Sequence, residues 1–153
     1  MKIKQKKMVF HNVISLKGTA KKNEWFRIAI ELRNYIIQNG LYVNAPVFYQ
    51  CVEGDNEAGK ESGLNEYTIY MPLNRKIEVS GDVSVAFHEE IAIEEALVFR
   101  LADINTPVKK AYLLLEACAS DQGYKLREPF YHVYLDVFGE GMLDIIAPIE
   151  RIQ

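Results

Sequence analysis

The chain carries a second, weaker copy of its first half about 83 positions further along. Gly40 and Gly123 are separated by this interval, and so are Pro46 and Pro129. Hydrophobic residues repeat at the same interval: Met8, Phe10, Ile14 and Leu16 correspond to Ile91, Ile93, Leu97 and Phe99. A duplicated unit of this size predicts two half-domains packed on each other, and a cleft at their seam is the natural place for a functional site.

Hydrophobic periodicity predicts one helix in each copy. In the first copy Trp25, Ala29, Leu32 and Ile36 recur at helical spacing, and Phe26, Ile30 and Ile37 widen the apolar face beside them. Asn23 is the expected N-cap and Gly40 the expected C′ residue. In the second copy Thr106-Pro107 is a typical helix start, and Gly123 is expected to close the helix. The expected buried stripe of this second helix consists of Val108, Ala111, Tyr112, Leu115, Cys118 and Ala119.

β-Branched and aromatic runs predict strands over 7–17, 46–52, 67–73, 91–103, 130–136 and 142–149. The expected fold is α+β: tandem duplicated β-α-β-β units form one antiparallel sheet with two main helices on one face. We expect a single domain over residues 1–153, with repeat 1 at about 7–73, a connector at about 74–90 and repeat 2 at about 91–150. Within the connector, residues 76–87 fit a short hairpin or a pair of linking extensions.

Composition excludes several classes of function. The net charge of −3 and the pI of about 5.7 argue against direct nucleic-acid binding, which needs a strongly basic field. No signal peptide or run of about 20 apolar residues is present, so we expect a cytoplasmic protein without a membrane partner. Cys51 and Cys118 lack metal-ligand spacing, and His88-Glu89-Glu90 lacks the second histidine of a zinc site because position 92 is Ala92. We therefore expect free thiols, no metal and no cofactor.

Charge is unevenly distributed along the chain. Seven lysines precede the first acidic residue, Glu24, whereas Glu53, Asp55, Glu57 and Glu61 crowd one glycine-rich loop. The lysines either keep a solvated edge strand from pairing with other chains or form a docking patch for an acidic protein partner. The acidic loop would repel phosphate, and no Gly-x-Ser-x-Gly nucleophile motif occurs.

Several ordered segments resemble the GyrI-like, or effector-binding, small-molecule-binding superfamily. The similar segments are Gln122-Gly123-Tyr124, Glu128-Pro129-Phe130-Tyr131 and the closing strand 143–149, which is echoed by 67–73 in the first half. The resemblance covers nearly the whole chain and implies two such repeats. Members include single-domain gyrase inhibitors and ligand-sensing domains of multidrug-responsive transcription factors.

The resemblance also implies a site. In the superfamily a carboxylate four residues before the closing proline projects into an aromatic cavity and compensates cationic, lipophilic ligands. The matching residue here is Asp144, one methylene shorter than the usual Glu, and its first-half counterpart is Thr68. The alternative is that Asp144 lies on a solvent-facing edge of the sheet. The expected aromatic walls, each with ordinary core packing as its alternative, are Trp25, Tyr49, Tyr67, His132 and Tyr134.

Three functions follow as hypotheses. The first is a non-enzymatic module that binds a lipophilic or cationic effector in the cleft between the repeats. Because the first predicted strand begins within ten residues, we expect a stand-alone sensor or sequestering module without its own DNA-binding helices. The second is a protein-interaction or accessory module, similar to gyrase inhibitors or partners of toxin and secretion clusters, with a filled cleft. The third is a hydrolase that uses Asp144 and a facing tyrosine as an acid/base pair.

Overall fold

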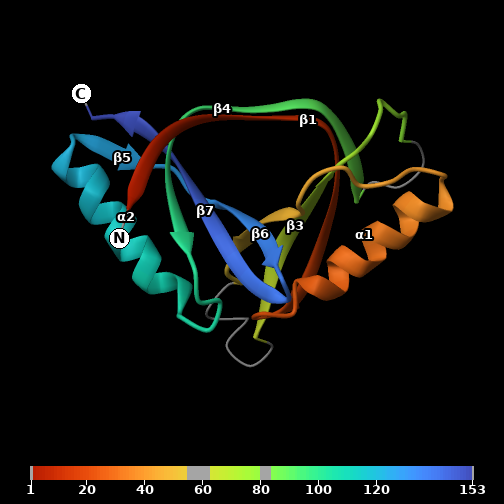
Figure 1. Cartoon of the computed structure of the whole chain (residues 1–153), viewed down its shortest axis with the longest axis horizontal. Coiled ribbons are helices and arrows are strands. Elements are labelled where there is room, and N and C mark those ends of the chain that lie inside the picture. The colour runs from red at the N-terminus through yellow and green to blue at the C-terminus, as the bar shows by residue number, and fades with distance from the viewer. Residues whose placement is uncertain (1, 55–62, 80–83, 153) are drawn as a thin grey trace. The chain divides into compact units, whose positions relative to one another are not determined.

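The computed structural model describes residues 2–54, 63–79 and 84–152 (Figure 1). Its elements are β1 (Ile3–Lys21), α1 (Phe26–Gln38), β2 (Phe48–Val52), β3 (Leu64–Pro72), β4 (Val85–Leu101), α2 (Val108–Asp121), β5 (Tyr124–Leu126), β6 (Tyr131–Val137) and β7 (Glu140–Arg151). The seven strands belong to one sheet, and the pairings described below are antiparallel. The predicted α+β class is confirmed, and the element order is β-α-β-β followed by β-α-β-β-β, so the second half carries the additional short strand β5.

The chain divides into two compact units. Unit 2 comprises residues 10–91, and unit 1 comprises residues 1–9 and 92–153. The long strands β1 and β4 therefore each contribute residues to both units. Within its own unit, each helix packs beside strands: α1 beside β3, and α2 beside β5 and β7 (Figure 1).

In unit 2, β3 lies between β1 and β2, and the register sorts their side chains onto two faces. Leu16 is opposite Ile69, which is opposite Tyr49, so these three share one face. This face carries α1, because Ile28 of α1 lies 3.1 Å from the position that a Cβ on Gly18 would take. β1 was predicted over 7–17 and begins earlier, at Ile3. It continues to Lys21, since the missing side chain at Gly18 leaves room for the helix.

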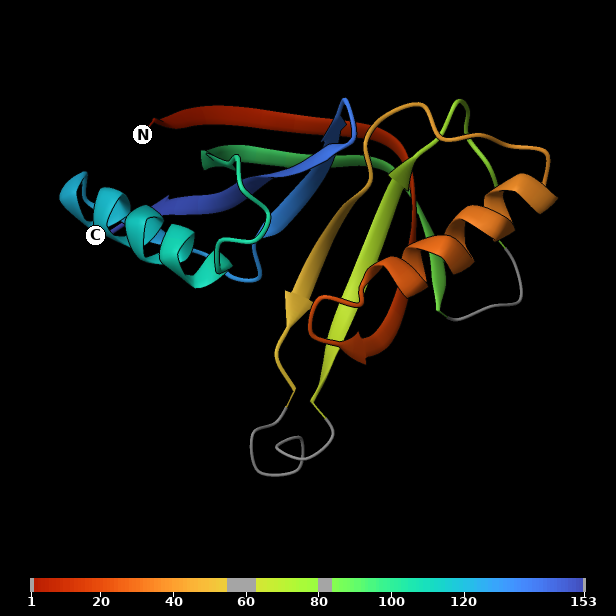
Figure 2. The same cartoon turned by 60° about the horizontal axis from the view of Figure 1, so that its bottom comes forward.

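In unit 1, β7 is the central strand. It pairs with β4 through 143–148, with β6 through 140–146 and with β5 through 149–151. A tight turn joins β6 to β7 (Figure 2), and its two central residues, Phe138 and Gly139, both have positive φ. The Gly139 N–H donates a 2.8 Å hydrogen bond to Asp136 Oδ1, which helps to fix the turn.

Both helices end as predicted but begin differently. Gly40 and Gly123 follow the helices with φ of +71° and +76°, the left-handed conformation expected of C′ glycines. The N-cap of α1 is Trp25 rather than Asn23, and the N-cap of α2 is Pro107 rather than Thr106. Neither start has a side-chain capping bond, so the two capping predictions were wrong.

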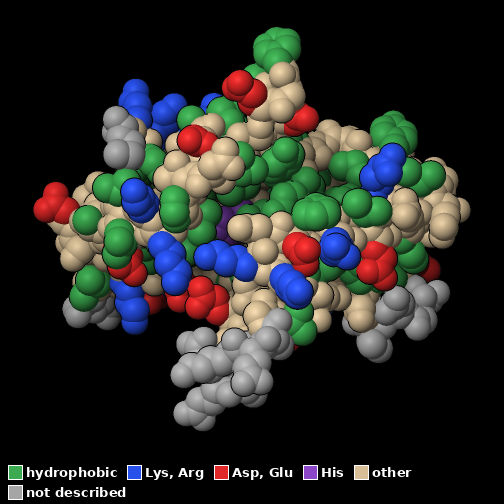
Figure 3. All heavy atoms as spheres, turned by 90° about the horizontal axis from the view of Figure 1, so that it is seen from below, with side chains coloured by type: hydrophobic (Ala, Val, Ile, Leu, Met, Phe, Trp, Pro, Cys, Tyr) green, Lys and Arg blue, Asp and Glu red, His purple; other side chains and the backbone are tan. Residues whose placement is uncertain are grey.

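The buried face of α1 is narrower than predicted. Ile28, Ala29, Leu32 and Ile36 are buried, but Phe26, Ile30 and Ile37 are 47%, 51% and 54% exposed. Seen from below, hydrophobic side chains accordingly interrupt the charged surface over the half that contains α1 (Figure 3). In α2 the expected stripe is confirmed in part: Ala111, Leu115 and Ala119 are buried, and the other three predicted residues are half-buried.

The connector differs from one of its two predicted forms. Residues 76–79 form no strand, so a hairpin over 76–87 does not occur among the described residues, and 80–83 lie outside them. β4 begins at Val85, six residues before the predicted strand. The short strand β5 was not predicted, since three residues carry too little periodicity to detect. Across the described residues, neither helix is long and apolar enough to cross a bilayer.

Candidate functional site

The six residues predicted to line a ligand site fall into two groups. Trp25, Tyr49 and Tyr67 lie in unit 2, and His132, Tyr134 and Asp144 lie in unit 1.

The aromatic group of unit 2 packs beneath the start of α1. The rings of Trp25 and Tyr49 stack with centroids 4.7 Å apart, and Tyr67 meets Tyr49 edge to face at 5.9 Å. Tyr49 and Tyr67 are buried, and desolvation raises the pKa of the Tyr67 hydroxyl. Cys51, opposite Tyr67 in the register, likewise has its pKa raised by burial. These three rings form a packed cluster on the helix-bearing face, and their role as walls of a ligand site stays a prediction.

His132 and Tyr134 lie on the helix-bearing face of unit 1. His132 is opposite Ile145 and Tyr134 is opposite Leu143, two buried positions of β7. His132 is 2% exposed, and its Nε2 shares a 2.5 Å hydrogen bond with the Tyr112 hydroxyl of α2. Because a buried imidazole needs such a partner, this contact ties β6 to α2.

Asp144 lies on the other face of the same strands. It is directly opposite Arg100 of β4 and Val133 of β6, one position out of phase with His132 and Tyr134. The carboxylate therefore does not share a face with these two aromatic residues. Arg100 donates two hydrogen bonds to it, from Nε to Oδ1 at 2.8 Å and from Nη2 to Oδ2 at 3.0 Å. The Asp144 side chain is 20% exposed and the Arg100 side chain 58% exposed.

Unit 2 also has a face opposite the one that carries α1, called the helix-free face below. The sequence analysis did not identify the aromatic residues on it. Phe10, Phe48 and Tyr70 form a stack with centroid separations of 4.2 and 4.8 Å. The Tyr70 hydroxyl donates a 2.6 Å hydrogen bond to Gln50 Oε1. These residues come from three separate strands: the register places Phe48 opposite Tyr70, and the ring of Phe10 stacks on that of Phe48.

Two polar groups complete this helix-free face. Ser15 is one of the two buried polar residues among those described, and its Oγ lies 3.0 Å from His88 Nε2. The His88 ring is 6.0 Å from that of Tyr70. Burial lowers the pKa of His88, because the charged imidazolium loses hydration there.

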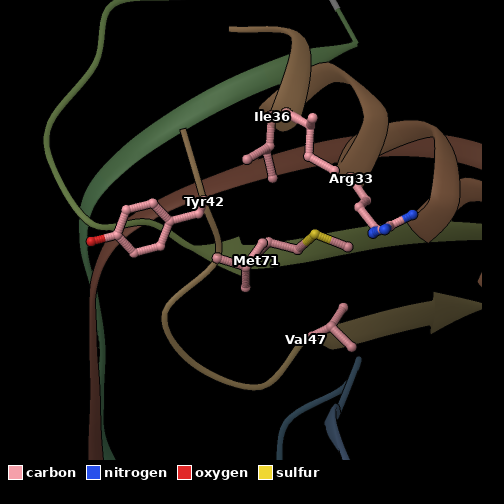
Figure 4. A pocket seen from close by; sticks show the side chains of 7 residues that line it. Arg33, Ile36, Tyr42, Val47 and Met71 are labelled. Carbon is pink, nitrogen blue, oxygen red and sulfur yellow. The ribbon is translucent and has the colours of Figure 1, made fainter. Parts of the chain in front are cut away.

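A cavity of about 350 Å³ opens in unit 2 between α1 and the start of β2. Arg33 and Ile36 extend from α1 toward Met71 of β3, and Val47 closes the opposite side (Figure 4). Ile37 and Tyr42 also line the cavity. The sequence analysis named none of these residues as a site residue, since part of the cavity wall, formed by Tyr42, Val43 and Val47, comes from the segment between α1 and β2, which is neither helix nor strand.

The remaining predictions concern the lysines, the acidic loop, the cysteines and metal ligands. Of the lysines before Glu24, Lys7 forms a 3.5 Å ion pair with Glu94 of β4, and both side chains are mostly exposed. Asp55, Glu57 and Glu61 lie outside the described residues, so the acidic docking loop stays a prediction. Cys51 and Cys118 are free thiols. In the described part of the chain, no three His, Cys, Asp or Glu side chains gather as metal ligands.

Solved structures with a similar fold include the EcmrR C-terminal domain, with a TM-score of 0.72 at 16% identity over 99% of this chain and 98% of that chain. The structure of EcmrR in its complex with DNA has a TM-score of 0.71 and 21% sequence identity over 99% of this chain. This chain spans 58% of that EcmrR chain. The structure of a hydrolase from Listeria innocua has a TM-score of 0.65 and 7% sequence identity, over 96% of this chain and 92% of that chain. This chain therefore shares its fold with the EcmrR C-terminal domain.

The comparison with curated proteins finds no match. A family model described as a domain of unknown function, DUF5085, matches residues 9–151. The chain therefore belongs to the DUF5085 family.

Proposed function

We propose that the protein is a non-enzymatic module that binds a small lipophilic cation, with Asp144 as the residue that compensates its charge. The observation that carries the proposal is the environment of Asp144. Its carboxylate is four-fifths covered, and Ile146, two positions along β7 and therefore on the same face, is buried.

Arg100 pairs with the Asp144 carboxylate and can be replaced there by a ligand cation. A mostly covered carboxylate is stable only with a counter-charge, and Arg100 supplies it through two hydrogen bonds. The Arg100 side chain is largely exposed, so it can return to water at little cost in hydration when another cation arrives. A ligand cation that replaces the guanidinium keeps Asp144 paired, and its apolar groups add burial that arginine does not provide.

Calorimetric titration with tetraphenylphosphonium, a lipophilic cation, tests the proposal. Asp144→Asn removes the negative charge and keeps the shape, and we expect it to weaken binding about tenfold, or about 1.4 kcal/mol. Arg100→Gln removes the competing cation, and we expect it to strengthen binding by a similar factor. The two opposite shifts separate a ligand site from a purely structural ion pair, which would give none.

Glu150→Gln is the matched control, because Glu150 lies on the same strand and is more exposed, with Arg127 as its ion-pair partner. It should leave the affinity unchanged. Tetraphenylborate has the same shape and the opposite charge, and it should bind wild type more weakly than the phosphonium. Equal phosphonium affinity in wild type and Asp144→Asn would disprove the assignment.

A further inference from the structure

We propose that the cavity beside α1 is a second binding site, specific for an amphiphile with one carboxylate and an apolar body. This site goes beyond the cation site at Asp144. It lies in unit 2 rather than unit 1 and carries the opposite charge.

The walls of the cavity are held in place before any ligand arrives. α1 ends with two bonds of a Schellman motif, from Gly40 N–H to Ile37 O at 3.1 Å and from Leu41 N–H to Ile36 O at 3.1 Å. These bonds turn the chain sharply, and Leu41 is buried behind the turn.

The segment after this turn is fastened to the end of β3. Val43 forms a bridge with Leu73, and the Asn44 N–H donates a 3.1 Å hydrogen bond to Pro72 O. The side of the cavity formed by Tyr42, Val43 and Val47 is therefore fixed to the sheet. A pre-formed cavity binds better than one that must be ordered by its ligand, because less entropy is lost.

Arg33 is the charged residue of the lining, and its surroundings leave it free to bind an anion. The residues one turn away on α1, at i±3 and i±4, are Ala29, Ile30, Ile36 and Ile37, none of which is acidic. Among the described residues, the Arg33 guanidinium has no hydrogen bond or ion pair. The other lining groups are apolar apart from the hydroxyl of Tyr42.

These features select the chemistry of the ligand. A planar guanidinium matches a carboxylate with two parallel hydrogen bonds, and it does so better next to apolar groups than in open water. The volume of about 350 Å³ is within the usual range for small-molecule pockets. Met71, which is 5% exposed, lies at the floor, and a flexible thioether adapts to an alkyl or aryl chain. A medium-chain or aryl carboxylic acid satisfies both the charge and the apolar lining.

Calorimetry with decanoate tests the site, with decanol and decylammonium as neutral and cationic probes of the same chain length. We expect the order decanoate, decanol, decylammonium in decreasing affinity. Arg33→Gln should weaken decanoate binding about tenfold to a hundredfold and leave decanol unchanged. Val47→Phe should weaken both, because the larger side chain fills the cavity.

Arg27→Gln is the matched control: the same substitution on the same helix, at an exposed arginine that is paired with Glu24 and lies outside the cavity. It should bind decanoate like wild type. The proposal is overturned if wild type does not bind decanoate at millimolar concentration, if Arg33→Gln binds it unchanged, or if decylammonium binds as tightly. Asp144→Asn should bind decanoate normally, so failure of this site and failure of the cation site are distinguishable.

Discussion

At the residue scale, His88 is a half-buried titratable group outside both proposed sites. Burial holds its pKa below the ordinary value of about 6.5. The unfolded chain therefore binds a proton more readily than the folded one. The stabilising contribution of the neutral imidazole is complete above pH 6.5 and is lost as the pH falls below that value.

We expect the free energy of unfolding to decrease from about pH 7.5 to pH 5, and His88→Gln to flatten this decrease. Urea denaturation at a series of pH values measures the free energy of unfolding of both proteins. His11→Gln is the control, because His11 is exposed and should leave the slope unchanged. A steeper slope in the His88 variant would show that the protonated form is favoured by folding instead.

Single residues also show where reasoning from the sequence stops. Asp144 was identified by its place before the closing proline, and the structure does put it on a mostly covered strand position. Its partner Arg100 is 44 positions away, and only the pairing of β4 with β7 brings the two together. Arg33 was missed for a related reason. Its importance comes from a cavity wall formed by residues 42–47, not from any pattern around it.

At the scale of elements, Gly40 ends α1 and starts the wall of the cavity. Its φ of +71° is unfavourable for any residue with a Cβ, although no atom would block one there. Gly40→Ala should reduce the free energy of unfolding by about 1 kcal/mol, and Gly40→Asn by less, because Asn tolerates this conformation better. Chemical denaturation compares the three proteins. Equal stability of the Ala variant and wild type would mean that α1 ends in another way in solution.

The same helix explains a mistake about burial. Phe26, Ile30 and Ile37 belong to the apolar face of α1 and were therefore expected to be buried. Periodicity shows how wide the apolar face of a helix is, but it does not show how much of that face the sheet covers. In unit 2 the sheet covers only the side with Ile28, Leu32 and Ile36. The helix ends were predictable from Gly40 and Gly123. The starts were not, since Trp25 and Pro107 cap without the side-chain bonds that make a cap visible in sequence.

At the scale of the whole molecule, the two copies found in the sequence have matching strand registers. Lys17 is opposite Thr68 in unit 2, and Arg100 is opposite Asp144 in unit 1, with the two basic residues related by the sequence repeat. One half therefore has a carboxylate where the other has a hydroxyl. This asymmetry was predicted from the closing strands alone. The cavity in unit 2 was not, because it depends on how the chain travels between α1 and β2.

The two proposed sites differ in charge and lie in different units, so binding at one should leave binding at the other unchanged. We expect the affinity for tetraphenylphosphonium to stay within about twofold when decanoate saturates the protein, and the reverse titration to agree, because coupling between two ligands is reciprocal. Titration calorimetry in both orders measures it, with Arg33→Gln showing the phosphonium affinity without bound decanoate. Mutual exclusion of the two ligands would place them in one shared site, and one of the two assignments would then be wrong.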